Sequence, residues 1–247
     1  MAINEPINIV SEDFQSAWLS VVRRLTRSNW ELRNLIVQIK NPSAIDQRVH
    51  EQVEHFALDQ GLLSPKHVAY TIFPHRLYLD KGNATDLFAG YNRAGGLYAR
   101  LQHRKPGWGT YFRRMTHYEG PAGTINQLEN IITAMRERDR ICKAAYTIIV
   151  QKPGGETVRP LGGPCLNYIA IQAERGNMDR PLRLGMLSVY RNHDFLERAY
   201  GNYWGLCNLL TFLAREVRGI AGPLTCVSSH AYIDGKKKPL MTMAAGF

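Results

Sequence analysis

The sequence predicts an α+β fold in which a mixed, twisted sheet packs against a long buried helix. Strand-like segments come in runs rather than in strict alternation with helices, most clearly over 144–151, 166–173 and 182–190. Residues 194–217 are apolar on most helical faces, which is typical of a largely buried helix. No repeat or linker interrupts the chain, so we expect one domain over residues 1–247.

The first half of the chain contains both helix and strand signals. Residues 11–27 carry apolar side chains at helical spacing, and Ser11 is placed to act as the N-cap. In the segments that follow, Gly61 and Pro74 each mark the end of an element. These segments predict a strand over 34–39, a helix over 45–61, a strand over 67–74 and a helix near 84–93.

The second half contains the best-marked helix and most of the predicted sheet. Residues 124–140 have apolar side chains at every third or fourth position, and Thr124 and Gln127 match a capping box. The remaining elements, in chain order, are strands over 144–151, 166–173 and 182–190, the helix over 194–217 and a strand over 223–233.

Composition narrows the class of protein. Hydrophobic residues make up 45% of the 247, yet no run is long enough to cross a membrane. The first residues lack the basic and apolar regions of a secretory signal. The four cysteines are 23, 42 and 19 residues apart, which matches no paired metal motif. We therefore expect a cytoplasmic protein with reduced thiols and no metal site.

The formal net charge of +10 favours a partner that carries phosphate. Basic residues are spread along the chain, and only Lys236–Lys238 form a run. No known nucleic-acid-binding motif is present. We therefore expect a small phosphorylated ligand, with nucleic acid as the weaker alternative.

A single cysteine stands where a turn meets a strand, in LGGPCLNYIAIQ over residues 161–172. Pro164 stiffens the backbone just before Cys165, and a thiol there can be desolvated on one side. A nearby cation such as Arg191 would lower the pKa of this thiol and raise the fraction of thiolate, which is the nucleophilic form. The alternative is a buried cysteine with a structural role only.

Residues 190–202, YRNHDFLERAYGN, combine a cation, amides and a carboxylate after a predicted strand. Arg191 can bind a phosphate through two parallel hydrogen bonds, and Asn192 and Asp194 can add further bonds. The Asn202 amide matches the edge of uracil or, when reversed, of cytosine. Because Asn202 follows Asp194 by about two helical turns, both would face one cavity. The alternatives are that Asn192 or Asp194 caps the helix and that Asn202 bonds a loop.

His230 and Tyr232 are two residues apart on the last predicted strand. Their side chains therefore share one face of the sheet. Two hydrogen-bonding groups on one face suit a sugar hydroxyl, whereas a lone His on a strand is more often structural.

Taken together, these motifs resemble the thymidylate synthase family. The match covers roughly residues 105–247 and consists of four pieces in family order: INQLENIITAMRERDR followed by GGPC, YRNHDFLERAYGN, SSHAY and KPLMTMAAGF. The resemblance implies a thymidylate synthase-like fold, a homodimer, and one-carbon transfer to C5 of a pyrimidine nucleotide through a covalent Cys165 adduct. It also implies 5,10-methylenetetrahydrofolate as the one-carbon donor.

The resemblance assigns a role to each candidate residue. Cys165 would be the nucleophile. The other contacts would be Arg191 and Asn192 to the phosphate, Asp194 to the base or the pterin, Asn202 to the pyrimidine edge, and His230 and Tyr232 to the sugar 3′-hydroxyl.

The sequence also departs from the family pattern. Leu166 stands where the family has a His, and the family's Arg pair has no counterpart beyond the nearby Arg138, Arg140 and Lys143. Glu54 is at best a weak match to the family's catalytic Glu. These differences indicate a divergent member. They leave open a catalytically inactive nucleotide-binding or regulatory homologue, as well as the base, the sugar and a methyl or hydroxymethyl product.

Overall fold

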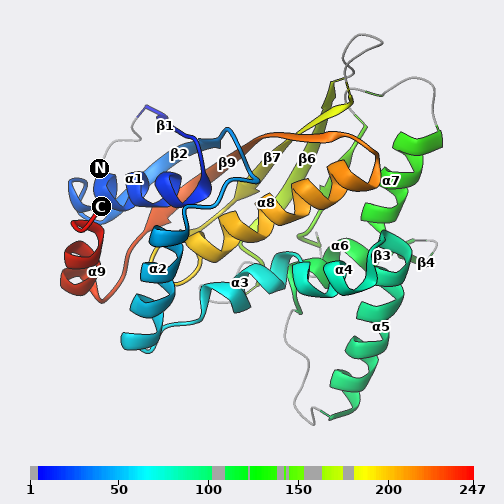
Figure 1. Cartoon of the computed structure of the whole chain (residues 1–247), viewed down its shortest axis with the longest axis horizontal. Coiled ribbons are helices and arrows are strands. Elements are labelled where there is room, and N and C mark those ends of the chain that lie inside the picture. Colours follow the sequence, from blue (N-terminus) through cyan, green and yellow to red (C-terminus); the bar gives the residue numbers. More distant parts are fainter. Residues whose placement is uncertain are drawn as a thin grey trace.

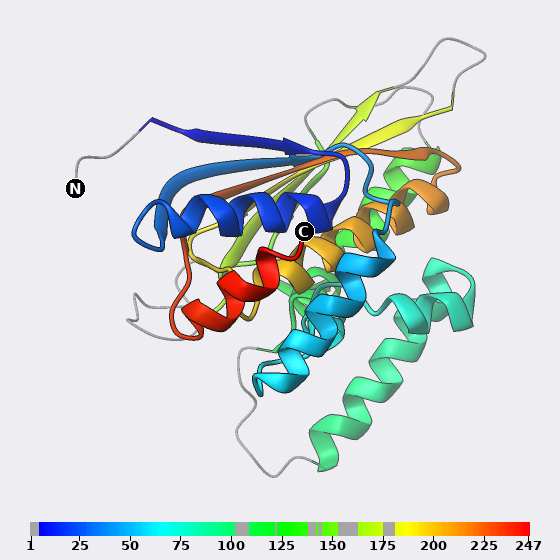
Figure 2. The same ribbon diagram turned by 60° about the vertical axis from the view of Figure 1, so that its left-hand side comes forward.

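The helices that the structure describes cover one face of the main sheet. The computed structural model describes residues 5–101, 109–121, 123–137, 142, 145–152, 163–174 and 181–247. Its main sheet has the strand order β1-β2-β9-β7-β6-β5, and the short β8 also pairs with β9 (Figure 1). All described helices lie on the same side of this sheet (Figure 2).

Pairing in the main sheet is mixed. β1–β2, β7–β9 and β8–β9 are parallel, whereas β2–β9, β6–β7 and β5–β6 are antiparallel. A separate hairpin is formed by β3 and β4. The strands are β1 (Ile7–Ser11), β2 (Glu31–Ile39), β3 (Tyr118–Gly120), β4 (Gly123–Ile125), β5 (Thr147–Ile149), β6 (Leu166–Glu174), β7 (Arg183–Tyr190), β8 (His193–Asp194) and β9 (Ile220–Tyr232).

The described helices connect and cover these strands. They are α1 (Phe14–Thr26), α2 (Gln47–Asp59), α3 (Pro65–Ile72), α4 (His75–Lys81), α5 (Ala84–Leu101), α6 (Tyr111–Thr116), α7 (Gln127–Glu137), α8 (Ala199–Glu216) and α9 (Lys237–Ala244). The prediction of an α+β fold with a mixed sheet is thereby confirmed.

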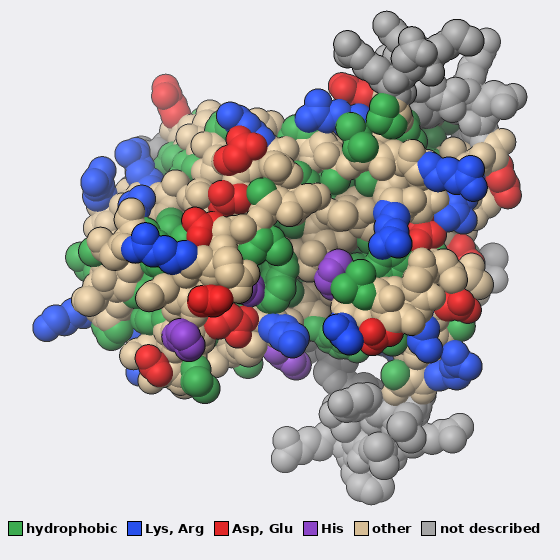
Figure 3. All heavy atoms as spheres, in the orientation of Figure 1, with side chains coloured by type: hydrophobic (Ala, Val, Ile, Leu, Met, Phe, Trp, Pro, Cys, Tyr) green, Lys and Arg blue, Asp and Glu red, His purple; other side chains and the backbone are tan. Residues whose placement is uncertain are grey.

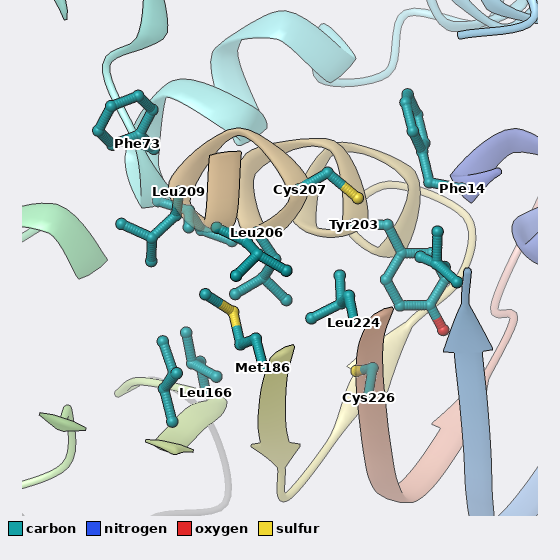
Figure 4. Packing of buried hydrophobic residues seen from close by; sticks show 14 of the residues in the cluster. Phe14, Phe73, Leu166, Met186, Tyr203, Leu206, Cys207, Leu209, Leu224 and Cys226 are labelled. Atoms are coloured by element: carbon teal, nitrogen blue, oxygen red, sulfur yellow. The ribbon is translucent and has the colours of Figure 1, made fainter. Parts of the chain in front are cut away.

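Helix α8 is the centre of the core, as its apolar composition predicts. Leu206 and Tyr203 lie above Met186 of β7 and Cys226 of β9, and all four are fully buried (Figure 4). On its other side α8 contacts α3 closely. A Cβ added to Gly201 would lie 2.6 Å from the Pro65 carbonyl oxygen, so this contact requires glycine.

One predicted strand is wrong. Residues 67–74 lie largely in α3, which begins at Pro65 directly after Ser64. Proline is favoured in the first helical turn because its missing N–H has no partner there. Val68, Ala69 and Ile72 then share one buried helical face, whereas the apolar run reads equally well as a short strand.

Three predicted helix starts are also corrected. Asp13, not Ser11, caps α1, because its Oδ1 accepts from Ser16 N at 2.7 Å. Thr124 lies in β4, and the capping oxygen of α7 belongs to Asn126, which accepts from Glu129 N at 3.2 Å. The buried helix begins at Ala199 and not near 194, because residues 193–194 pair with β9 as β8.

The other predicted elements are found, with altered ends. The structure places β2, α2, α5, β6, β7 and β9 where the sequence predicts them, and β5 is shorter than expected. Strand β1, which pairs in parallel with β2, was not predicted. Residues 138–140 and 144 of two predicted elements lie outside the described residues.

Candidate active site

Cys165 lies immediately before β6, and its thiol is partly buried. Its backbone is held from two other segments. The Cys165 N–H donates to the Tyr111 hydroxyl of α6 at 3.2 Å, and the Cys165 carbonyl accepts from Arg191 N at 2.9 Å. The turn–strand junction predicted from the sequence is therefore a well-anchored position for a thiol.

Arg191 lies against the turn that carries the thiol. Its Nε donates to the Pro164 carbonyl at 3.1 Å, and a Cβ added to Gly163 would lie 3.7 Å from its Nη2. Gly163 itself has a φ of 82°, a conformation that side-chain-bearing residues rarely adopt. The structure thus brings Arg191 and Cys165 together, as expected from the sequence.

The electrostatic surroundings of the thiol are mixed. Burial raises the pKa of Cys165 above its usual value and outweighs the opposing effect of the cations Arg191 and Arg198. The carboxylate of Asp194 adds to the increase. The thiol is therefore mostly protonated at neutral pH, and only a stronger local positive charge or a base would raise the thiolate fraction.

Asp194 is the last residue of β8, and its side chain contacts the turn that leads to α8. Its Oδ1 accepts from Leu196 N at 2.8 Å and from Glu197 N at 3.2 Å. It therefore caps this turn rather than the helix. The argument that Asp194 and Asn202 share a helical face is wrong, because Asp194 lies in a strand.

His230, Tyr232 and Asn192 form a second group beside the thiol. The rings of His230 and Tyr232 are stacked with centroids 5.4 Å apart, which confirms that they share one face. The Asn192 Oδ1 lies 2.7 Å from His230 Nδ1, so this nitrogen carries the proton and donates. Asn192 is also hydrogen-bonded to Tyr232, and His230 Nε2 lies 3.8 Å from a Glu31 carboxylate oxygen.

Asn202 lies in the first turn of α8 and is buried. Its Nδ2 is 3.1 Å from His193 Nε2, and His193 Nδ1 is 2.9 Å from the Ser228 hydroxyl of β9. The alternative that Asn202 bonds a neighbouring segment is therefore the arrangement seen here. One amide N–H and the Oδ1 of Asn202 are not used by this contact.

Sequence reasoning missed three residues of this cluster. His193 was visible within YRNHD but received no role. Arg198 lies seven residues after Arg191, and Tyr111 lies in a segment that is far from Cys165 in the sequence. Glu54, the weak match to a catalytic Glu, lies on α2, where its carboxylate influences the pKa of Tyr200 rather than that of Cys165.

Two hollows of the described surface lie away from Cys165. One of about 720 Å³ lies between β1 and α1 beside Arg23, Arg24 and Arg27, and one of about 510 Å³ lies beside Arg136 and Glu216. Lys and Arg side chains are spread over the face shown in Figure 3 rather than gathered in one patch. Among the described residues, no group of three His, Cys, Asp or Glu could hold a metal, and no helix could span a membrane.

Comparison with known proteins does not extend this description. No protein-family model matches the chain, and no curated protein is significantly similar to it. The resemblance to thymidylate synthases accordingly remains a prediction carried by the motifs. Arg138, Arg140 and Lys143, the residues nearest to the family's Arg pair, lie outside the described residues.

Proposed function

We propose that this protein transfers a one-carbon unit to C5 of a pyrimidine nucleotide through a covalent Cys165 adduct. One observation carries the proposal. Three segments that are distant in the sequence, Gly163–Cys165, Arg191–Asp194 and His230–Tyr232, meet around one partly buried thiol. They supply a nucleophile, a cation and neutral hydrogen-bonding groups, which are the groups that such a nucleotide requires.

Each group has a chemical task in this proposal. The Cys165 thiolate adds to C6, which makes C5 nucleophilic. C5 then bonds to the one-carbon unit and loses its proton, and the bond between that unit and its carrier breaks so that the carrier leaves. The bond between sulfur and C6 breaks in the last step. Arg191 and Asn192 bind the 5′-phosphate in this proposal, and His230 and Tyr232 bind the sugar. Asn192 also links the two groups, because its Oδ1 accepts a hydrogen bond from His230.

We propose 5,10-methylenetetrahydrofolate as the donor, which would supply an electrophilic carbon at the level of formaldehyde. The Asp194 carboxylate has one oxygen that could bind the pterin of the folate. Its Oδ1 is used by two backbone N–H groups, and among the described residues no hydrogen-bond donor contacts its Oδ2. That oxygen would accept from a pterin N–H and orient the ring. Whether hydride or water then completes the product decides between a methyl and a hydroxymethyl group.

A homodimer is part of the proposal. Side chains alternate along a strand, so the sheet face opposite the helices carries Ile36, Val227, Val189 and Tyr168. Cross-strand pairing places these four in one row across β2, β9, β7 and β6. No described helix covers this face of the sheet (Figure 2). We propose that the apolar row packs against the same row of a second copy of the chain. Val189→Lys should convert a dimeric mass in light scattering to a monomeric one, whereas a monomeric unchanged protein would contradict the dimer.

The alternative is a nucleotide-binding or regulatory homologue without turnover. One observation favours it: burial raises the pKa of the Cys165 thiol in spite of Arg191 and Arg198. Leu166, which is fully buried beside the thiol, offers no proton acceptor. This alternative predicts nucleotide binding without any chemistry at C5.

Release of tritium from 5-tritiated dUMP, dCMP, UMP and CMP tests the proposal, because loss of the C5 proton is required for the transfer. With the folate supplied, we expect release from one of the four nucleotides and none with Cys165→Ser. Retention of label in all four would reject the proposed transfer. Tight binding together with full retention would support the regulatory alternative.

A further inference from the structure

We propose that His193 is a positioning residue that holds the Asn202 amide in one orientation and thereby determines whether uracil or cytosine is accepted. This inference rests on the proposed function, because it takes Asn202 as the residue that contacts the pyrimidine edge. His193 itself touches no substrate in this proposal and acts through Asn202.

The His193 ring is held on all sides. Only 1% of its surface is exposed, and both ring nitrogens have a partner: Asn202 Nδ2 at 3.1 Å and Ser228 Oγ at 2.9 Å. The ring is stacked on Tyr190 with centroids 4.1 Å apart and planes within 1°. The ring of Tyr203 is T-shaped to it, with centroids 5.5 Å apart and planes at 89°. The ring therefore cannot turn without breaking both aromatic contacts and both hydrogen bonds.

The hydrogen bonds define which nitrogen carries the proton. An amide nitrogen only donates, so His193 Nε2 must accept from Asn202 and is unprotonated. Complete burial lowers the pKa of His193 to about 3, so the ring is neutral at neutral pH and has one proton. That proton is on Nδ1 and is donated to Ser228 Oγ. The Ser228 hydroxyl lies in hydrogen-bond reach of the Cys226 thiol, which gives its own proton an acceptor.

This arrangement limits the Asn202 amide to one orientation. Reversing the amide would place Oδ1 against the lone pair of Nε2, and two acceptors repel. A stable reversal would require the proton to move to Nε2 and Ser228 to become the donor to Nδ1. The second N–H and the Oδ1 of Asn202 consequently keep fixed positions relative to a ligand.

Uracil and cytosine require opposite orientations of such an amide. Uracil offers a donor at N3 and an acceptor at O4, whereas cytosine offers an acceptor at N3 and a donor at N4. A freely reversing amide accommodates both bases, but a fixed one leaves donor facing donor and acceptor facing acceptor with the wrong base. Unpaired buried polar groups of this kind weaken binding by roughly tenfold to a hundredfold.

The network also connects Asn202 with the thiol. Tyr190, which stacks on His193, is the cross-strand partner of Leu166, the residue after Cys165. Asp194, which follows His193 in β8, raises the pKa of the Cys165 thiol. The His193–Asn202 pair therefore lies within the same cluster as the candidate nucleophile.

The tautomer of His193 is tested by nitrogen-15 NMR of protein labelled at histidine. We expect a buried histidine with a proton on Nδ1 and an unprotonated Nε2, assigned by its loss in His193→Phe. A proton on Nε2 would overturn the inference, because the amide would then be free to present its oxygen to the ring. This measurement needs neither substrate nor turnover.

The consequence for the base is tested by calorimetry with dUMP and dCMP. The unchanged protein should prefer one nucleotide by roughly tenfold or more. His193→Phe keeps the ring stack but removes the hydrogen bond to Asn202, and it should lose most of that preference. Ser228→Ala, a smaller change that removes the acceptor for Nδ1, should reduce it as well. The control Tyr203→Phe alters a ring that packs on His193 but no hydrogen bond to it, and should retain the preference.

The outcomes separate the inference from the proposed function. Equal affinity of the unchanged protein for both nucleotides, or an undiminished preference in both His193→Phe and Ser228→Ala, would overturn the role of His193 while leaving nucleotide binding in place. Failure of the unchanged protein to bind either nucleotide would overturn the proposed function and this inference together.

Discussion

The backbone N–H of Arg191 donates a 2.9 Å hydrogen bond to the Cys165 carbonyl, so the candidate cation and the candidate nucleophile form one structural unit. The Arg191 side chain returns to the same turn through Pro164. A phosphate that binds Arg191 would therefore stand at a defined position relative to the thiol.

Arg191→Ala should weaken nucleotide binding by roughly tenfold to a hundredfold, because charge-assisted hydrogen bonds contribute about 1.5–3 kcal/mol each. Binding of the matching nucleoside, which lacks the phosphate, should change little. Calorimetry with both ligands measures the difference. Arg183→Ala, at the opposite end of β7, is the control and should leave both affinities unchanged. Equal losses for nucleotide and nucleoside would show that Arg191 is structural.

The pH dependence of Cys165 alkylation should report on both neighbouring arginines. Removing a cation disfavours the thiolate, so Arg191→Ala and Arg198→Ala should each raise the thiol pKa further and slow iodoacetamide labelling near pH 8. The larger change is expected for Arg191, which lowers this pKa more. Unchanged rates in both variants would contradict the electrostatic description of the site.

The stability of the protein should fall in acid partly because of His193. Its pKa is lowered by burial from an ordinary value of 6.5 to about 3, so between these values the unfolded chain binds the additional proton. The stabilisation is complete above pH 6.5 and is lost as the pH falls toward 3, by up to about 5 kcal/mol. Urea unfolding at several pH values should show a steeper loss for the unchanged protein than for His193→Phe. Parallel slopes would mean that His193 is not held neutral.

The contact between α3 and α8 should tolerate no side chain at Gly201. A Cβ there would overlap both the Pro65 carbonyl and Val68, each at 2.6 Å, so Gly201→Ala should destabilise the fold by about 1–3 kcal/mol. Gly90→Ala is the matched control in α5, where the nearest atom is the flexible end of Lys81. That control should be neutral or stabilising by up to about 1 kcal/mol. Thermal unfolding of both variants compares them directly.

Local patterns predicted most elements because the chain obeys simple periodicities there. The apolar strip along residues 127–137 predicts a helix with one buried face. The apolar character of residues 199–216 on most faces predicts a buried helix. The 67–74 segment was misassigned because eight apolar-rich residues satisfy both periods. Its helical state depends on Pro65 and on contact with Gly201 and Gly205, which only the folded chain reveals.

The candidate site was predictable to the extent that its residues lie in short motifs. Cys165, Arg191 and the pair His230 and Tyr232 were recognised from turn and strand spacing. Tyr111 could not be, because it reaches Cys165 from a segment 54 residues earlier through a hydrogen bond from the Cys165 backbone. His193 was overlooked because its importance comes from complete burial between Asn202 and Ser228, which no local pattern expresses.

Formation of a covalent bond between Cys165 and C6 of a pyrimidine nucleotide is the central claim, and peptide mass spectrometry tests it most directly. The 5-fluoro derivatives of dUMP and dCMP are suitable probes, because fluorine on C5 cannot leave as a proton does and the adduct persists. With 5,10-methylenetetrahydrofolate present, the peptide containing Cys165 should gain the mass of one nucleotide plus the folate, and Cys165→Ser should gain none. An unmodified Cys165 with both probes, under conditions where calorimetry shows the nucleotide to be bound, would contradict the account.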